Sequence, residues 1–303
     1  MNQDFLNQLC EIVGSDHVCV DEPMKDHTTF RIGGNADYFV SPHSAKEIGD
    51  VIEACKNAGI PWYVIGNGSN LLVSDRGFRG VIIRLFKNFA MLSVEGEEIC
   101  VQAGALLSRT AKKALEHELT GFEFAAGIPG TIGGALVMNA GAYGGEMKDV
   151  TKFVMVLTPE GKVLTLGKEE LEMGYRTSII ARKGYLVLEA VLGLQKGDKE
   201  QIAARMEELK EKRVSKQPLE YPSAGSTFKR PEGYFAGKLI MDAGLRGFSV
   251  GGAQVSEKHC GFVINTGDAT AKDVTELIKT VTERIREQTG VTLEPEVKLL
   301  GEF

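Results

Sequence analysis

The 303-residue sequence has no apolar run near the roughly 18–20 residues that a membrane-spanning helix needs. Its first residues lack a basic segment followed by an apolar stretch, so we expect no signal peptide. Basic residues are also in the minority, with 35 Lys and Arg against 41 Asp and Glu and a net charge of −6. This balance disfavours nucleic acid or an anionic membrane as the main partner. We therefore expect a cytoplasmic protein whose main partner is neither nucleic acid nor a membrane.

Cysteine and histidine are scarce, and neither occurs in a spacing typical of metal ligands. There are five of each, no C-x-x-C pair is present, and the cysteine number is odd. We expect reduced thiols and no metal. The sequence also lacks the G-x-S-x-G elbow of serine hydrolases. The cysteines are Cys10, Cys19, Cys55, Cys100 and Cys260.

Glycine, in contrast, is abundant and concentrated in two places. Residues 127–145 are rich in glycine and almost free of charge, unlike a solvated linker. Because glycine loses the most conformational entropy on ordering, a folded segment of this kind indicates close approach to another backbone or to a ligand. A second cluster, Gly66–Asn70, follows the apolar run Trp62–Ile65.

The cluster at Gly66–Asn70 matches neither of the common nucleotide-binding patterns. Leu71 stands where the Rossmann fingerprint requires its third glycine, and the Gly-Lys-Ser/Thr ending of a Walker loop is missing. Its small residues can form a backbone nest for an anion, or a tight turn with polar tips. These two interpretations are equally good for the cluster alone.

The longer glycine segment offers a similar choice. Thr131 or the pair Gly133-Gly134 can open a short helix whose N-terminal amides face a phosphate. Close helix–strand packing without any ligand also explains the glycines. Two such clusters, neither of them of nicotinamide or ATP type, favour a flavin dinucleotide in an extended groove.

The pattern of apolar residues predicts an α+β fold. A capping box at Ser44–Glu47 begins a predicted helix that stops at Gly59, and residues 91–103 and 153–166 are typical of hairpins. A charged helix over 199–216 marks the clearest boundary, and further strands are expected at 291–293 and 297–300. We divide the chain into three parts, at 1–87, 88–198 and 199–303.

Three polar clusters near the ends of predicted elements supply candidate catalytic residues. Arg176 can hold a carboxylate with two parallel hydrogen bonds, Ser226 can point into a cleft beside glycine backbone, and Glu296 can donate or accept a hydrogen bond. Each also has an ordinary explanation: a surface ion pair, a turn cap or a solvated carboxylate. From spacing alone, the ordinary explanation is the better one for each residue taken singly.

Seven segments in order along the chain resemble the UDP-N-acetylenolpyruvoylglucosamine reductase family. Any one of them is weak, but the ordered set is specific and spans nearly the whole chain. The segments are Thr28–Gly34, Gly66–Leu72, Ile128–Gly134, Asn139–Tyr143, Tyr175–Ser178, Gly225–Lys229 and Leu293–Val297.

The resemblance implies a flavoprotein of peptidoglycan precursor synthesis. It implies two FAD-binding α+β subdomains of the vanillyl-alcohol-oxidase type followed by a C-terminal substrate domain. The short stretch between Tyr175 and the long helix matches the family's shorter second type, which lacks an extra tyrosine-bearing loop. Residues assigned to FAD are Gly66, Asn67, Gly68, Ser69, Asn70, Pro129, Gly130, Thr131, Gly133, Gly134, Asn139 and Gly141.

By the same resemblance, NADPH reduces FAD, which reduces the enolpyruvyl ether of a UDP-sugar. Arg176 and Glu296 stabilise the enolate and Ser226 delivers the proton. Glu296 is then expected to hold or share a proton, since an ionised glutamate would repel the enolate. Residues assigned to substrate binding are Tyr175, Lys229 and Lys238, and the chain is expected to be a monomer or weak oligomer.

Two other functions remain to be separated from this one. Another flavin oxidase of the same fold would be favoured by a His or Cys in the first glycine cluster for covalent flavin attachment, and neither is there. A sugar-nucleotide sensor without activity would be expected to have lost one of Arg176, Ser226 and Glu296.

Overall fold

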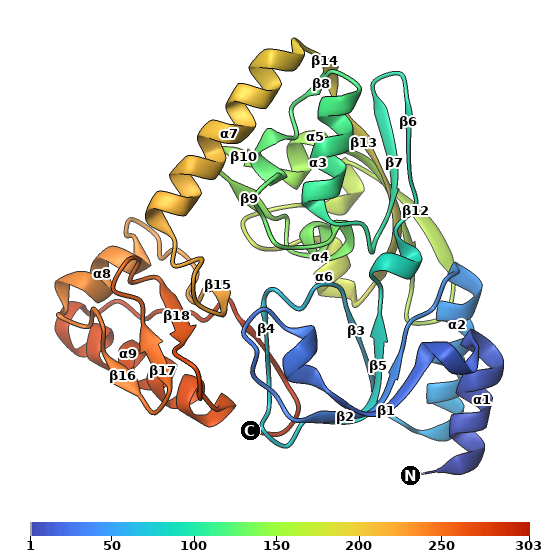
Figure 1. Cartoon of the computed structure of the whole chain (residues 1–303), viewed down its shortest axis with the longest axis horizontal. Coiled ribbons are helices and arrows are strands. Elements are labelled where there is room, and N and C mark those ends of the chain that lie inside the picture. The colour runs from blue at the N-terminus through green and yellow to red at the C-terminus, as the bar shows by residue number, and fades with distance from the viewer. Residues whose placement is uncertain (1) are drawn as a thin grey trace. The chain divides into compact units, whose positions relative to one another are not determined.

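The computed structural model describes residues 2–303 and divides into two compact units, each built from separate stretches of the chain (Figure 1). The first unit comprises residues 2–19, 38–67 and 80–213, and the second comprises residues 20–37, 68–79 and 214–303. The chain passes from the first unit to the second within α7 (Lys199–Lys216), the helix that we predicted as a boundary. Our division into three domains stays a prediction.

Helices α1 (Gln3–Val13) and α2 (Ala45–Ala58) pack against each other in the first unit, as Figure 1 shows. The predicted capping of α2 is confirmed, because the Ser44 hydroxyl accepts from the Glu47 N–H at 3.2 Å and Gly59 ends the helix at φ 64°. A four-stranded sheet has the order β1-β2-β5-β3, and its strands include residues that are assigned to each of the two units. Its strands are β1 (Val18–Pro23), β2 (Asn35–Val40), β3 (Trp62–Ile65) and β5 (Phe78–Arg84).

A five-stranded antiparallel sheet with the order β12-β11-β13-β7-β6 lies entirely within the first unit. Both predicted hairpins are confirmed in it. Its strands are β6 (Leu92–Glu95), β7 (Glu98–Gln102), β11 (Thr151–Leu157), β12 (Val163–Gly167) and β13 (Leu186–Gly193). Four helices accompany it: α3 (Leu107–Glu116), α4 (Ile132–Val137), α5 (Met147–Val150) and α6 (Ile179–Lys183).

Short strands and 3₁₀ turns lie between the longer elements. Two small antiparallel pairs connect β9 with β10 and β8 with β14. The strands are β8 (Leu119–Thr120), β9 (Gly141–Ala142), β10 (Gly145–Glu146) and β14 (Gln195–Lys196). The 3₁₀ turns are η1 (Ser15–His17), η2 (Met24–His27), η3 (Lys87–Phe89), η4 (Glu123–Ala125) and η5 (Glu169–Leu171).

The second unit has its own core, built around α9 (Ala271–Thr289). Thr270 caps this helix in the predicted capping box, and Val274, Leu277 and Val281 are buried along one face. A sheet with the order β15-β18-β17-β16 accompanies it, and β19 pairs in parallel with β4. The remaining elements are β4 (Leu71–Val73), β15 (Ser223–Ser226), α8 (Ala236–Asp242), β16 (Ser249–Val250), β17 (Ala253–Val255), β18 (Phe262–Asn265) and β19 (Lys298–Leu300).

One predicted strand is wrong. Residues 291–293 form no strand, and the only β-pairing of the C-terminal segment before β19, within the described residues, is an isolated bridge at Pro295. Leu293 is buried in the core of the second unit, so its apolar character reflects packing rather than a sheet.

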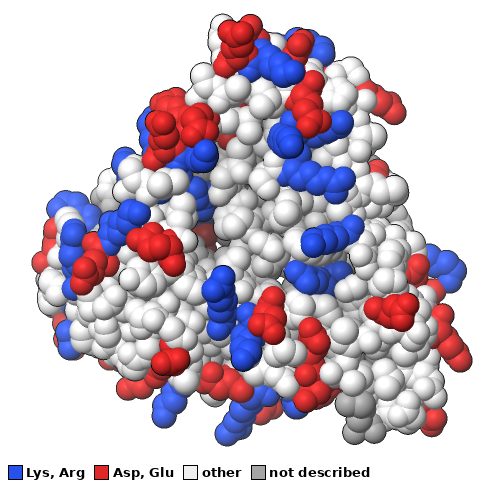
Figure 2. Space-filling view, viewed as in Figure 1, with Lys and Arg blue, Asp and Glu red and all other residues white. Residues whose placement is uncertain are grey.

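Figure 2 shows acidic and basic side chains interspersed over the face that it draws. On α7 many of them pair at helical spacing, as Lys210 does with Glu207 at 2.9 Å. Within residues 2–303, no helix is both long and apolar enough to span a membrane. All five cysteines are free, and burial raises the pKa of the Cys55 thiol to about 12, which keeps it unreactive at neutral pH.

Candidate active site

The two glycine clusters meet in the first unit. A β-carbon at Gly66 would lie 2.2 Å from Oγ1 of Thr131, so only glycine fits between β3 and the start of α4. The Asn67 carboxamide also donates to the Pro129 carbonyl at 2.8 Å. The segments around Gly66 and Thr131 are more than 60 residues apart in the sequence. They pack closely because Gly66 has no side chain, and the Asn67–Pro129 hydrogen bond links them.

A cavity of about 460 Å³ opens beside this meeting point. Strand β3, helix α4 and strand β13 line it with mainly apolar side chains, and Gly66, Gly133 and Gly134 also belong to the lining. Such a cavity suits a flat apolar ring with a polar group near the glycines. Its lining includes Trp62, Tyr63, Val64, Ile65, Val137 and Val187.

The start of α4 explains some of its glycines by packing. The N–H groups of Ile132 and Gly133 donate to the carbonyls of Ala105 and Ala103 at 2.9 and 2.8 Å. A β-carbon at Gly133 would also lie 2.9 Å from Cβ of Ala103. The short helix that we expected is present, but these two amides are used within the protein. The assignment of Gly133 to the cofactor therefore stays a prediction. Packing against Ala103 is enough to explain why this position is a glycine.

Other residues assigned to FAD have structural partners. The Gly130 carbonyl accepts from the Leu107 N–H at 3.1 Å, and Gly141 leaves no room for a β-carbon, which would lie 2.7 Å from the Gly145 carbonyl oxygen. Gly68, Ser69 and Asn70 belong to the second unit. In that unit a β-carbon at Gly68 would lie 2.2 Å from the His27 carbonyl oxygen.

Arg176 lies in a tight turn of the first unit. Gly174 and Thr177 exchange both backbone hydrogen bonds, at 3.0 and 3.3 Å, which makes Tyr175 and Arg176 the two central residues. Arg176 has φ 54°, in a region where glycine or asparagine is normally found. A non-glycine residue held in this conformation costs about 1–3 kcal/mol, and such strain clusters at functional sites.

Ser226 and Glu296 are brought together in the second unit. The Glu296 N–H donates to the Thr227 carbonyl at 2.8 Å, and Phe228 forms a β-bridge with Pro295. The Glu296 side chain belongs to a residue that is only 7% exposed. Ser226 ends β15, and the register of β15 against β18 shifts between Ser223 and Ser226.

Two further residues, Asn70 and Thr227, hold the segments of Ser226 and Glu296 in place, a role that we did not predict for either of them. The Asn70 carboxamide, which we assigned to FAD, donates to the Glu296 carbonyl at 3.1 Å. The Thr227 hydroxyl accepts from the Val263 N–H at 2.9 Å, and its N–H donates to the Gly261 carbonyl at 2.8 Å. Asn70 and Thr227 both lie inside segments that resemble the reductase family. Their hydrogen-bond partners are distant in the sequence, however, and such contacts leave no local sequence pattern.

The residues assigned to substrate binding have different environments. Lys229 forms an ion pair with Glu294, and Lys238 forms one with Asp242 at 2.7 Å on α8. Tyr175 is 57% exposed, and its ring centre lies 5.6 Å from the Arg176 guanidinium carbon. Their contact with a substrate stays a prediction. Among residues 2–303, no three His, Cys, Asp or Glu side chains are grouped to hold a metal.

Comparison with known proteins decides the family. Residues 36–167 match the model of an FAD binding domain, and residues 217–300 match that of the UDP-N-acetylenolpyruvoylglucosamine reductase C-terminal domain. A UDP-N-acetylenolpyruvoylglucosamine reductase from Lachnoclostridium phytofermentans is 58% identical, over 100% of this chain and 99% of its own. This chain belongs to the UDP-N-acetylenolpyruvoylglucosamine reductase family.

Further members of the reductase family support this result. A relative from Clostridioides difficile is 52% identical over 99% of both chains. The crystal structure of UDP-N-acetylenolpyruvylglucosamine reductase from Thermus caldophilus superposes with a TM-score of 0.80 at 37% identity, covering 94% of this chain and 98% of that one. The predicted fold class, α+β with an FAD-binding region and the family's C-terminal domain, is confirmed. The chain is an oxidoreductase with an FAD-binding domain.

Proposed function

We propose that this chain reduces UDP-N-acetylglucosamine enolpyruvate to UDP-N-acetylmuramate with FAD as cofactor and NADPH as donor. The reaction would serve peptidoglycan precursor synthesis, and hence cell shape and division, in the cytoplasm. Full-length relatives carry the name of this reductase. The observation that carries the proposal is the hydrogen bond between the Glu296 N–H and the Thr227 carbonyl, because it joins the backbone of the buried residue Glu296 to the residue that follows Ser226.

The residues around the first-unit cavity fit FAD. The cavity of about 460 Å³ would receive a flat ring of the cofactor, and the open space beside Gly134 would let a large ligand approach the backbone closely. Gly134 is exposed on the first turn of α4, where a β-carbon would meet only Thr131 Oγ1, at 3.7 Å. When bound and reduced, FAD supplies the hydride that adds to the methylene carbon of the enolpyruvyl double bond.

Arg176 has the role of holding the substrate carboxylate. Its guanidinium offers two parallel N–H donors, and the turn between Gly174 and Thr177 fixes the backbone from which it projects. As the double bond is reduced, negative charge develops on this carboxylate. A cation already held in place stabilises that charge without reorganisation during the step.

Ser226 has the role of proton donor. Its hydroxyl gives a proton to the carbon next to the carboxylate, so that one hydride and one proton complete the reduction. Among residues 2–303, no hydrogen bond involves the Ser226 hydroxyl. Glu296, protonated in its buried position, donates a hydrogen bond to the carboxylate together with Arg176.

Isotope labelling of the product tests the function. The protein is incubated with NADPH and the enolpyruvyl sugar in D₂O, and the product is analysed by mass spectrometry and NMR. The proposal predicts one solvent deuterium at the carbon beside the carboxylate, because the serine hydroxyl exchanges with solvent before it donates. Absence of a reduced product, or a product without solvent deuterium at this carbon, would contradict the proposal.

A further inference from the structure

The turn that carries Arg176 needs support, because its backbone conformation is unfavourable for arginine. Arg176 has φ 54° and is not glycine, so a relaxed loop would tend to leave this conformation. The two backbone bonds between Gly174 and Thr177 close the turn but do not attach it to the rest of the unit. The support must therefore come from side chains outside the turn.

Asn139 supplies such a contact. It is 2% exposed and follows α4, and its carboxamide nitrogen donates to the Gly174 carbonyl at 3.0 Å and to Oε2 of Glu146 at 2.7 Å. Its carboxamide oxygen accepts from the Lys148 N–H at 2.9 Å. Both hydrogens of the Asn139 amide nitrogen are thus donated within the protein, and the amide oxygen accepts a third hydrogen bond. Because the nitrogen faces acceptors and the oxygen faces a donor, the amide can lie only one way round.

Glu146 and Ser178 complete this support from two sides. Oε2 of Glu146 also lies 3.1 Å from the Lys148 ammonium, and Glu146 caps α5, so the carboxylate that receives Asn139 is itself held in place. On the far side of the turn, the Ser178 hydroxyl donates to the Val137 carbonyl at 2.7 Å. The turn is therefore bound at both ends to the residues at the end of α4.

We propose that Asn139 is a positioning residue for Arg176. By holding the Gly174 carbonyl, it keeps the turn in the conformation that presents the guanidinium to the substrate carboxylate. This inference rests on the proposed function, because the position of Arg176 affects catalysis only if Arg176 binds the substrate carboxylate. It also gives the Asn139 carboxamide a role other than the contact with FAD that the sequence led us to expect.

The main test is Asn139→Asp. Aspartate keeps the size of the side chain and tolerates the φ of 45° at this position, but it cannot donate to Gly174 and places a second carboxylate against Glu146. We expect reduction of the enolpyruvyl sugar by prereduced enzyme to slow at least about tenfold, because misplacement of a catalytic group by about 1 Å costs up to 100-fold. Reduction of the flavin by NADPH should change less than about threefold, since Arg176 has no role in that step.

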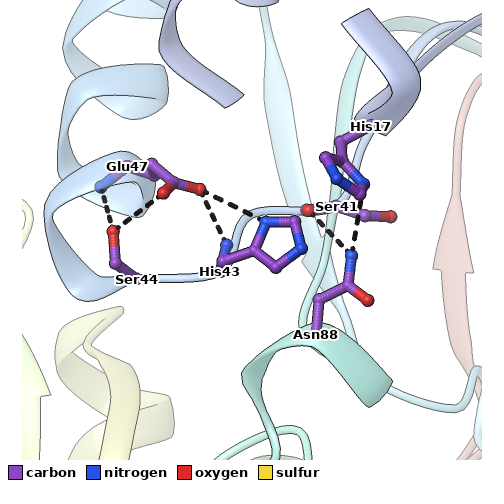
Figure 3. Close-up of polar contacts among 6 residues, drawn as sticks. All are labelled: His17, Ser41, His43, Ser44, Glu47 and Asn88. Carbon is purple, nitrogen blue, oxygen red and sulfur yellow. Dashed lines mark hydrogen bonds and ion pairs between the residues drawn. The ribbon is translucent and has the colours of Figure 1, made fainter. Parts of the chain in front are cut away.

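Asn88→Asp is the matched control. Asn88 lies in the same unit, and its carboxamide nitrogen donates to the Ser41 carbonyl at 3.2 Å and lies 3.5 Å from Nδ1 of His17, as Figure 3 shows. This variant also loses a carboxamide that holds a backbone carbonyl, but at a site with no part in the proposal. Both half-reactions should keep the wild-type rate, whatever the change in melting temperature.

A double-mutant cycle separates this inference from the proposed function. In an Arg176→Ala background, Asn139→Asp should slow enolpyruvyl reduction by less than about twofold, because a residue that acts through Arg176 has no effect without it. If Arg176→Ala alone leaves this half-reaction unchanged, the proposed role of Arg176 fails. If Arg176→Ala slows it but Asn139→Asp does not, or slows it equally in both backgrounds, only the positioning role fails.

Hydrogen exchange gives a readout that does not depend on activity. The Thr177 N–H, which donates to the Gly174 carbonyl, should exchange at least about tenfold faster in Asn139→Asp than in wild type. Unchanged protection of this amide would contradict the proposal. If Asn139→Asp does not fold, Asn139→Gly removes the same two donors, tolerates the positive φ, and carries the same expectations.

Discussion

The N–H of Glu296 donates to the carbonyl of Thr227 at 2.8 Å, which holds the C-terminal segment against the residue that follows Ser226. The Asn70 carboxamide binds the Glu296 carbonyl at 3.1 Å, so the backbone of Glu296 is fixed from both sides. Ser226 and Glu296, 70 positions apart in the sequence, therefore lie on segments that are hydrogen-bonded to each other. The first two predictions concern their separate roles.

Ser226→Ala should stop proton delivery while leaving the cofactor site intact. We expect reduction of the enolpyruvyl sugar to slow at least about 100-fold, the lower end of what general acid catalysis contributes. Reduction of the flavin by NADPH should stay within about threefold of wild type, since this step needs no proton from Ser226. Stopped-flow absorbance of the flavin measures both half-reactions. Ser223→Ala, on the same strand, is the control and should change neither. A Ser226→Ala enzyme that reduces the sugar at nearly the wild-type rate would remove Ser226 from the mechanism.

Glu296 should act in its protonated form. Glu296→Gln keeps a neutral hydrogen-bond donor of the same size, so enolpyruvyl reduction should fall by less than about tenfold, whereas Glu296→Ala should lose about 100-fold or more. Glu287→Gln, an exposed carboxylate on α9, should leave the rate unchanged. Equal and large losses in the Gln and Ala variants would show instead that the ionised carboxylate is required.

Gly66→Ala should block the cofactor site by displacing Thr131. The added β-carbon would lie 2.2 Å from Oγ1 of Thr131, so the start of α4 must move away from β3. We expect FAD affinity to fall at least about tenfold, as measured by flavin fluorescence during titration, with partial recovery in Gly66→Ala/Thr131→Ala. Gly49→Ala within α2 has nothing within 4 Å of its β-carbon and should leave affinity unchanged. Wild-type affinity in Gly66→Ala would disprove a role for this contact.

His259 should make the second unit less stable in mild acid. Burial lowers its pKa, and the Gly261 N–H donates to its Nδ1 at 3.2 Å, which the protonated ring could not accept. The unfolded chain takes up this proton as the pH falls through about 6.5, before the folded protein does, so His259 contributes stability above that pH that is lost below it. We expect the melting temperature to drop less between pH 7 and pH 5.5 in His259→Asn than in wild type. Identical pH dependence of the two proteins would contradict this prediction.

Local features of the fold could be predicted because their causes lie within a few residues of each other. The Ser44–Glu47 capping box and Gly59 bound α2, and Thr270 begins α9, as expected. The strand expected at 291–293 is wrong, since the burial of Leu293 in a core looks the same in sequence as burial in a sheet. The parallel pairing of β19 with β4, about 230 residues apart, has no local signal.

The residue types of the candidate site could be predicted, but not what holds them. The sequence indicated Arg176, Ser226 and Glu296 by resemblance, and assigned Asn70 and Asn139 to FAD. The structure shows that both asparagines bind the backbone of segments carrying proposed catalytic residues. The φ of 54° at Arg176 was equally hidden, because its chain position gives no hint of a left-handed conformation.

The most direct test of the account is an anaerobic visible absorption spectrum of the purified, FAD-loaded protein. NADPH is added first, and then the UDP-enolpyruvyl sugar. We predict flavin bands that bleach with NADPH and return when the sugar is added, which would establish cofactor, donor and acceptor together. Bleaching without recovery would contradict the proposed substrate, and a protein that shows no flavin bands after incubation with FAD would contradict the whole account.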